Sequence, residues 1–276
     1  MKRAIDIKER SFTPVRFIGK GNVDNKELLN PWGVAVNNSN EVFVTDRSNH
    51  RIVVLNEKGD FIRSFGENLL NNPTGICIDR DGRIFVANKG NNKILLLNPK
   101  GEYLRTIHKG RSLKQPRGIS LNGQGNLVVC DAENQCIRFI SPEGAILKTI
   151  GKGRLHMPLD CLCYQDQIFV SDIKAHLIQV YDSEGGFLYE FGRLENEDGE
   201  LNGPTGLAVD KTGHLLVCSE NNHRVQVFAL DGKFVAKFGK CGGGLGQMHC
   251  PCSISVLKGA GIIVAELLNN RLQIFE

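Results

Sequence analysis

The chain has 276 residues, of which 41% are hydrophobic and 23% charged, and its formal net charge is +4. This is an ordinary globular composition, long enough for one large domain or two small ones, and no apolar stretch approaches the roughly 20 residues of a membrane span. The N-terminal stretch MKRAIDIKER carries charges without an apolar segment after them, so we expect no secretory signal and no membrane partner. The nine cysteines are an odd number, which favours reduced thiols in a cytoplasmic protein.

A proline that opens a short strand recurs along the whole chain. It stands at Pro31, Pro73, Pro116, Pro158, Pro204 and Pro251, at spacings of 42, 43, 42, 46 and 47 residues. Glycine follows two residues later in four copies, whereas Asp160 and Ser253 replace it in the other two. Self-similarity at this period predicts a repeat architecture.

Each repeat is predicted to contain four short strands. In the first copy the second, third and fourth strands are expected at 42–46, 52–55 and 61–66, rich in Val, Ile, Phe and Leu. The penultimate position of the second strand is always small, which predicts a crowded site: Thr45, Ala87, Cys130, Ser171, Cys218 and Ala265. No segment shows a helical period, and four-stranded units of this length are typical of a propeller.

We therefore predict an all-β, six-bladed β-propeller with four antiparallel strands per blade. The blades are expected at residues 31–66, 73–108, 116–151, 158–192, 204–239 and 251–276. The sixth unit lacks its fourth strand, and the segment 12–19 (FTPVRFIG) ends like the other fourth strands. We expect this N-terminal strand to complete the last blade and close the ring, which removes an open sheet edge. Residues 1–11 are then a tail.

The motif SNHRIVV at 48–54, with GNNKILL, NNHRVQV and LNNRLQI in later copies, resembles the NHL repeat. The resemblance covers about residues 12–276, although IKAHLIQV in the fourth unit departs from it. The chain is most similar to the C-terminal propellers of TRIM-NHL proteins and looks like a domain excised from a longer protein. The resemblance implies a binding domain: several relatives bind RNA on one end and repress translation, whereas others bind proteins.

Basic residues gather in the first four units. The residues that follow each repeat proline and each second-strand acid should lie nearest the central opening, since recognition by such folds takes place on loops. The early blades place Arg47, Lys89 and Arg117 there, whereas the fifth places Glu220. The neighbouring loops add further basic residues: Lys109, Arg111, Lys114, Lys152, Arg154, Lys174 and His176. The connection at 193–203, before the fifth unit, is acidic instead.

Like charges on one surface repel each other unless an anion binds there, so this basic sector predicts a phosphate-binding face. RNA would supply phosphates for these cations and bases that stack on Trp32 or on guanidinium planes. By the resemblance, Arg47 matches a position that faces RNA in relatives. The alternatives are that the basic residues only keep their loops soluble, and that Trp32 only packs under its loop.

Two other classes of function are weighed against RNA binding. A protein-docking propeller that recruits a substrate or cofactor to a ubiquitin ligase is the main alternative. A zinc lyase, as among some propellers of similar repeats, needs three histidines that converge on the axis, and His156, His214 and His249 stand at unequal phases. The cysteines show no paired C-x-x-C spacing, which argues against a metal site. The glycine-rich stretch KCGGGLGQ at 240–247 lacks the Lys-Ser/Thr pair that ends a phosphate-binding loop. We expect no enzyme activity, no metal or cofactor, and a monomeric domain.

The arginines that begin several third strands are expected to be structural. Arg51, Arg224 and Arg271 share one phase, and an acid stands five residues before Arg51 and Arg271. We expect acid–arginine pairs that brace the loop. His50 and His223 precede two of these arginines at equal phase and are expected to belong to the repeat pattern.

Overall fold

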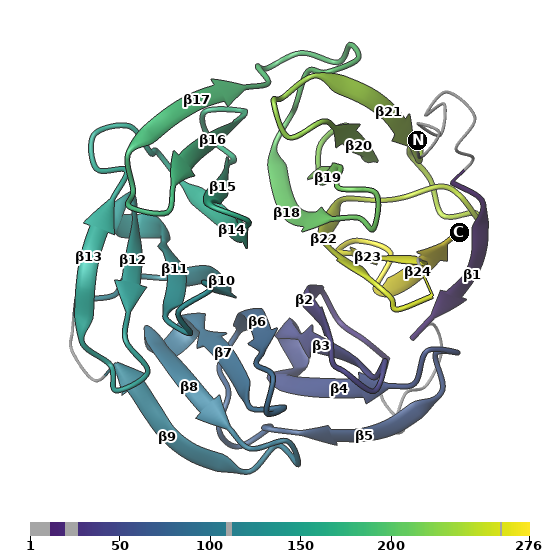
Figure 1. Ribbon diagram of the computed structural model, residues 1–276. Helices are drawn as coiled ribbons and strands as arrows, with labels where there is room; N and C mark the ends of the chain where they lie inside the picture. Colours follow the sequence, from purple (N-terminus) through teal and green to yellow (C-terminus); the bar gives the residue numbers. More distant parts are fainter. Residues whose placement is uncertain (1–11, 20–26, 109–111, 260) are drawn as a thin grey trace, which may run out of the picture.

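The computed structural model describes residues 12–19, 27–108, 112–259 and 261–276. These residues form a ring of six four-stranded antiparallel sheets around a central axis (Figure 1). The predicted fold class is confirmed. Within the described residues, no helix has both the length and the apolar character to cross a membrane.

Each blade is a meander whose first strand lies nearest the axis (Figure 1). Blade 1 contains β2 (Pro31–Val36), β3 (Val42–Asp46), β4 (Arg51–Leu55) and β5 (Phe61–Phe65). Blade 2 contains β6 (Pro73–Ile78), β7 (Ile84–Asn88), β8 (Lys93–Leu97) and β9 (Tyr103–His108). Blade 3 contains β10 (Pro116–Leu121), β11 (Leu127–Asp131), β12 (Cys136–Ile140) and β13 (Ile146–Ile150). Blade 4 contains β14 (Pro158–Tyr164), β15 (Gln167–Asp172), β16 (Leu177–Asp182) and β17 (Phe187–Phe191).

The remaining blades follow the same order. Blade 5 contains β18 (Pro204–Val209), β19 (Leu215–Ser219), β20 (Arg224–Phe228) and β21 (Phe234–Phe238). Blade 6 contains β22 (Pro251–Val256), β23 (Ile262–Glu266) and β24 (Arg271–Phe275), and β1 (Pro14–Ile18) is its outermost strand. Short 3-10 helices connect the second and third strands of the first three blades: η2 (Arg47–Asn49), η3 (Lys89–Asn91) and η4 (Ala132–Asn134).

The N-terminal strand closes the ring, as predicted. β1 pairs antiparallel with β24, and the backbones of Thr13 and Glu276 exchange hydrogen bonds of 2.7 and 2.9 Å (Figure 1). The edge of β24 is therefore covered by a strand from the other end of the sequence. The predicted tail, residues 1–11, lies outside the described residues.

The hydrophobic core lies between neighbouring blades. In the described part of the chain, each blade interface has its own cluster of buried apolar side chains. The small residues at the penultimate position of each second strand are all fully buried, which confirms the crowding expected there. All nine cysteines are free thiols, and Cys130 and Cys218 occupy two of these small positions.

A side chain at the end of each second strand holds the loop that enters the blade. In blade 1 the buried Asp46 carboxylate accepts hydrogen bonds from Leu29 N (2.7 Å) and Arg51 Nε (2.8 Å). Glu266 pairs with Arg271 in the same way in blade 6 (2.9 Å), so the predicted acid–arginine braces are confirmed in these two blades. Arg224 differs because Ser219 stands at the acid position, and its guanidinium donates to two backbone carbonyls instead.

A second set of contacts ties several blades to the next. His50 has a positive φ of 55°, and its Nδ1 accepts the backbone N–H of Asn72 in the following connection (3.0 Å). His176 and His223 accept the N–H groups of Gly203 and Cys250 at 3.1 Å. His50 and His223 thus belong to the repeat pattern, as expected. These contacts hold the loops at the end of the ring where the first strands begin, which we call the mouth end.

Candidate functional site

A group of charged side chains converges at the mouth end, around Trp32. We call it the mouth cluster: Trp32, Arg47, Lys89, Arg117 and Glu220. Trp32 and Arg117 are the second residues of the inner strands β2 and β10, whereas Arg47 and Lys89 begin η2 and η3. Glu220 directly follows β19. The repeat geometry therefore brings residues from four blades to one end of the axis.

Two guanidinium groups lie over the indole of Trp32. The Cζ atoms of Arg47 and Arg117 stand 5.0 and 5.1 Å from the ring centroid, within the range of cation–π attraction. Trp32 is only 9% exposed. Arg117 is 8% exposed and so as buried as the indole, whereas Arg47 is half-buried, so a ligand approaching from solvent would meet Arg47 first.

Burial and neighbouring positive charges lower the pKa values of two cations in the mouth cluster, Lys89 and Arg117. Burial, followed by the charge of Arg47, lowers the pKa of Arg117 to about 10. Burial, followed by the charges of Arg117 and Arg47, lowers the pKa of Lys89 to about 8. Burial raises the pKa of Glu220, and the charges of Arg117 and Arg47 oppose that rise. Positive charge is therefore concentrated in a partly desolvated site.

The three cations have no hydrogen-bond or ion-pair partner among the described residues. Within the described residues, no hydrogen bond or ion pair holds the side chains of Arg47, Lys89 or Arg117. The Nε atoms of Arg47 and Arg117 are buried without an acceptor. An unsatisfied buried donor costs roughly 1–3 kcal/mol, and more when charged.

The other predicted site residues divide into three groups. Lys114, Lys152 and Lys174 are exposed on loops of the mouth end, so they share a rim with the cluster. Arg154 and His176 point elsewhere: the Arg154 guanidinium lies 3.9 Å over the ring of Phe187 on the outermost strand β17, and His176 holds the next connection. Lys109 and Arg111 lie outside the described residues.

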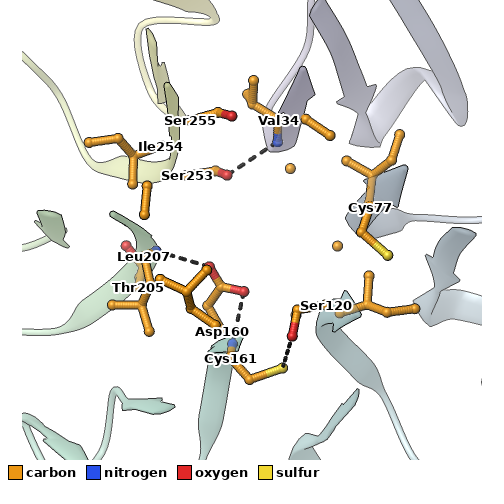
Figure 2. A pocket seen from close by; sticks show the side chains of 18 of the residues that line it. Val34, Cys77, Ser120, Asp160, Cys161, Thr205, Leu207, Ser253, Ile254 and Ser255 are labelled. Carbon is orange, nitrogen blue, oxygen red and sulfur yellow. Dashed lines mark hydrogen bonds between the residues drawn. The ribbon is translucent and has the colours of Figure 1, made fainter. Parts of the chain in front are cut away.

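A cavity of about 320 Å³ runs along the axis between the inner strands (Figure 2). Asp160 enters it at the position that most repeats give to glycine. Its carboxylate accepts the N–H groups of Cys161 (2.9 Å) and Leu207 (3.0 Å) and so links blade 4 to blade 5. Burial raises its pKa to about 7. Ser253, at the equivalent position, accepts the N–H of Val34 (3.2 Å) and links blade 6 to blade 1 (Figure 2).

These two links explain how the ring tolerates the lost glycines. Both replacements carry a side-chain acceptor that reaches a backbone N–H of the neighbouring inner strand. Sequence reasoning identified the substitutions but not their partners. The sequence signal for these links is that both replacements, Asp160 and Ser253, have a side-chain oxygen that can accept a hydrogen bond.

One group of potential metal ligands was missed by sequence reasoning. The ligand atoms of His223, His249 and Cys250 all lie within 4.8 Å of one another. However, His223 Nδ1 accepts the N–H of Cys250, which leaves the proton of a neutral imidazole on Nε2. Burial also raises the pKa of the Cys250 thiol to about 11. Ligation by this group would therefore require the His223 Nδ1 hydrogen bond to break, or its ring proton to leave Nε2, and the Cys250 thiol to lose its proton to the metal.

Comparison with known proteins agrees with this architecture. Residues 28–55, 70–95, 113–138 and 201–228 match the family described as NHL repeat, and these segments fall in blades 1, 2, 3 and 5. Four of the six blades of this propeller thus contain a segment similar to the NHL repeat. A stretch of 49 residues is 39% identical to Protein lin-41 of Caenorhabditis elegans, covering 18% of this chain and 4% of that protein.

Solved structures show the same fold at low sequence identity. An inactive virginiamycin B lyase from Staphylococcus aureus with quinupristin is 18% identical, with a TM-score of 0.70 over 96% of this chain and 85% of that one. The WD40 propeller domain of Doa1 is 11% identical, with a TM-score of 0.67 over 96% of this chain and 97% of that one. A nutrient-binding protein from Bacteroides ovatus is 12% identical, with a TM-score of 0.75 over 96% and 77%.

Proposed function

We propose that the mouth end binds single-stranded or loop RNA, and that the chain is the RNA-recognition domain of a TRIM-NHL-type protein that represses mRNAs in the cytoplasm. The observation that carries the proposal is the set of three cations at the mouth that no hydrogen bond or ion pair within the described residues holds. The partial similarity to lin-41 supports the same assignment.

The arrangement suits an unpaired nucleic-acid strand. Phosphate oxygens would accept from Arg47, Lys89 and Arg117, since guanidinium groups bind phosphates through paired donors. A base freed from a helix would stack on the guanidinium plane of the half-buried Arg47, because Trp32 and Arg117 are only 9% and 8% exposed. The exposed Lys114, Lys152 and Lys174 would extend the phosphate track along the rim.

Binding to homopolymer RNAs tests the proposal with matched charge changes at the two ends of the ring. Arg47→Gln and Lys89→Gln each remove one mouth cation, whereas Lys100→Gln and Lys211→Gln each remove one exposed cation from turns at the opposite end. A lost charge-assisted contact of about 1.5–3 kcal/mol weakens binding roughly tenfold or more. We expect such losses for the mouth variants and changes below about twofold for the controls. Equal losses of RNA affinity in the mouth variants and in the controls would mean that RNA does not bind at the mouth.

Protein docking is the second candidate, because apolar side chains are exposed on the same end. Leu29 and Leu268 are 43% and 51% exposed, next to the junction of blades 6 and 1. A partner bound through such leucines would be nearly insensitive to salt, whereas RNA binding would weaken steeply as salt rises.

We propose further that the domain is not an enzyme. The described histidines support this, because His50, His176 and His223 hold inter-blade connections instead of converging on the axis. Elemental analysis of the purified protein tests the proposal, since a stoichiometric bound metal would favour a lyase-like activity.

A further inference from the structure

The connection that enters blade 6 brings three potential metal ligands together. The ligand atoms of His223, His249 and Cys250 all lie within 4.8 Å of one another, and the two imidazole rings meet edge to face with their centroids 5.2 Å apart. His223 directly precedes β20, whereas His249 and Cys250 directly precede β22. The group therefore joins a loop of blade 5 to the first strand of blade 6.

The repeat pattern accounts for His223 but not for the other two ligands. Where a histidine also holds the connection at other junctions, the two residues before the repeat proline are amides or glycine: Asn71 and Asn72 beside His50, and Asn202 and Gly203 beside His176. Within the described residues, His223 is the one histidine of this pattern that has a second imidazole and a thiol beside it.

Cys250 also has a backbone conformation that favours other residue types. Its φ is 55°, in the left-handed region, where Asn and Gly are much commoner than Cys. The equivalent residues with positive φ are Asn30, Asn72, Gln115 and Gly203. The Cys250 thiol has no hydrogen-bond partner within the described residues, so the cysteine brings no visible benefit to the fold. A residue kept in an unfavourable conformation points to a role for its side chain.

The two histidines can each offer a lone pair. His223 Nδ1 accepts the N–H of Cys250 (3.1 Å), so the neutral ring carries its proton on Nε2, and a metal would take the place of this N–H at Nδ1. No hydrogen bond among the described residues holds the ring nitrogens of His249. Both imidazoles are partly exposed, which gives an ion a path from solvent. The Cys250 thiol would release its proton when the metal binds.

We propose that His223, His249 and Cys250 bind Zn²⁺, with water in the fourth position. Two imidazoles and a thiolate suit zinc, whereas Ca²⁺ and Mg²⁺ prefer oxygen ligands. Ligand atoms of a tetrahedral zinc site stand roughly 3.5 Å apart, so these side chains need to close by roughly 1 Å. Rotation of the partly exposed histidine rings can supply this movement. The bound ion would fasten the loop before β20 to the connection that enters β22.

The zinc site is separate from the axis and from the RNA-binding proposal. The described residues that line the axial cavity include none of its three ligands. Zinc bound here would nevertheless appear in elemental analysis of the wild-type protein. The test for a lyase-type metal is therefore made on Cys250→Asn, in which only metal held elsewhere would remain.

Zinc titration of the reduced, metal-free full chain against a chromogenic chelator tests the proposal. Each ligand is replaced by asparagine, because the repeat itself places asparagine at the equivalent positions: Asn92 and Asn270 for His223, Asn71 for His249, and Asn72 for Cys250. Asn92 and Asn270 accept the corresponding backbone N–H groups at 2.7 and 2.8 Å, so His223→Asn can keep the link between the blades. His50→Asn is the matched control, since it makes the same change at a junction without the other two ligands.

We expect each of the three variants to bind zinc more than about 100-fold more weakly than the wild type, because loss of a residue that only orients a metal ligand already costs about 10–100-fold. His50→Asn should bind zinc like the wild type. Zinc at about 100 times its Kd should raise the Tm of the wild type by about 5 °C and leave the Tm of the three variants unchanged. No zinc binding by the wild type, or an affinity within about tenfold of the wild type in any of the three variants, would overturn the proposal.

Cobalt(II) in place of zinc reports whether a thiolate is among the ligands. The wild type and His50→Asn should show a thiolate-to-cobalt charge-transfer band in the near ultraviolet, and Cys250→Asn should lack it. A band that persists in Cys250→Asn would come from another thiol and would contradict the assignment.

Discussion

Replacing Asp46 with alanine tests the side-chain contacts that position the mouth loops. The Asp46 carboxylate is fully buried and accepts from Leu29 N and Arg51 Nε, and Arg51 is itself fully buried. The substitution leaves a buried guanidinium without its main counter-charge and a backbone N–H without its acceptor. Breaking a buried ion pair in this way costs about 3–5 kcal/mol.

Blade 2 supplies a matched control within the same chain. Asn88 stands at the position of Asp46 and accepts the N–H of Asn71 (2.7 Å), but the residue at the position of Arg51 is the exposed Lys93. Asn88→Ala therefore leaves the Asn71 N–H without its acceptor but leaves no buried charge unpaired. We expect this to lower the free energy of unfolding by about 1–3 kcal/mol. We expect Asp46→Ala to lose about 2 kcal/mol more than Asn88→Ala.

Urea unfolding followed by the fluorescence of Trp32, the single tryptophan, measures both variants. The urea midpoints of both variants should be lower than that of the wild type. The slope of the unfolding free energy against urea concentration should stay the same, which would indicate that the substitutions lower stability without changing the folded state. Equal losses in the two variants, or a smaller loss for Asp46→Ala, would refute the argument that the buried charge makes the blade 1 contact the stronger one.

Three further outcomes follow from the mouth and from the ring closure. RNA affinity should fall as the pH rises from about 7 to 9, because Lys89, with a pKa of about 8, is charged below pH 8 and neutral above it. Lys89→Arg should remove this pH dependence in a binding titration. An unchanged pH profile in the variant would mean that another group causes the dependence. Glu220→Gln removes the carboxylate beside Arg117 and Arg47 and should tighten RNA binding at low salt, whereas weaker binding would mean that Glu220 contacts the ligand. Deleting residues 1–18 removes β1 and exposes the edge of β24, which should lower Tm by more than about 10 °C or cause aggregation in calorimetry and gel filtration; a stable monomer would contradict the closure.

The ring and its closure are predictable from sequence because they depend on patterns local to each repeat. The recurring proline, the apolar strands and the small residue at each crowded position report on backbone and burial, which every copy repeats. The convergence of Arg47, Lys89 and Arg117 at one end follows from their phase within the repeat. Their role in RNA binding stays a prediction.

The direction of individual side chains is not predictable in the same way, because neighbouring blades decide it. Arg154 occupies a basic connection, yet Phe187 of the next blade draws its guanidinium toward the outer flank. Trp32 is covered by arginines from two different blades, which no single repeat reveals. The sequence suggests that His176 is a free basic residue. In the structure, however, its Nδ1 accepts the N–H of Gly203.

The salt dependence of RNA binding tests the central assignment most directly. For single-stranded RNA, each phosphate neutralised by a protein cation contributes about −0.7 to the slope of log affinity against log salt concentration. The double variant Arg47→Gln/Arg117→Gln removes two such cations, so its slope should be shallower than that of the wild type by about 1.4. A wild-type slope near zero, or the same slope in both proteins, would contradict RNA binding at the mouth of this propeller.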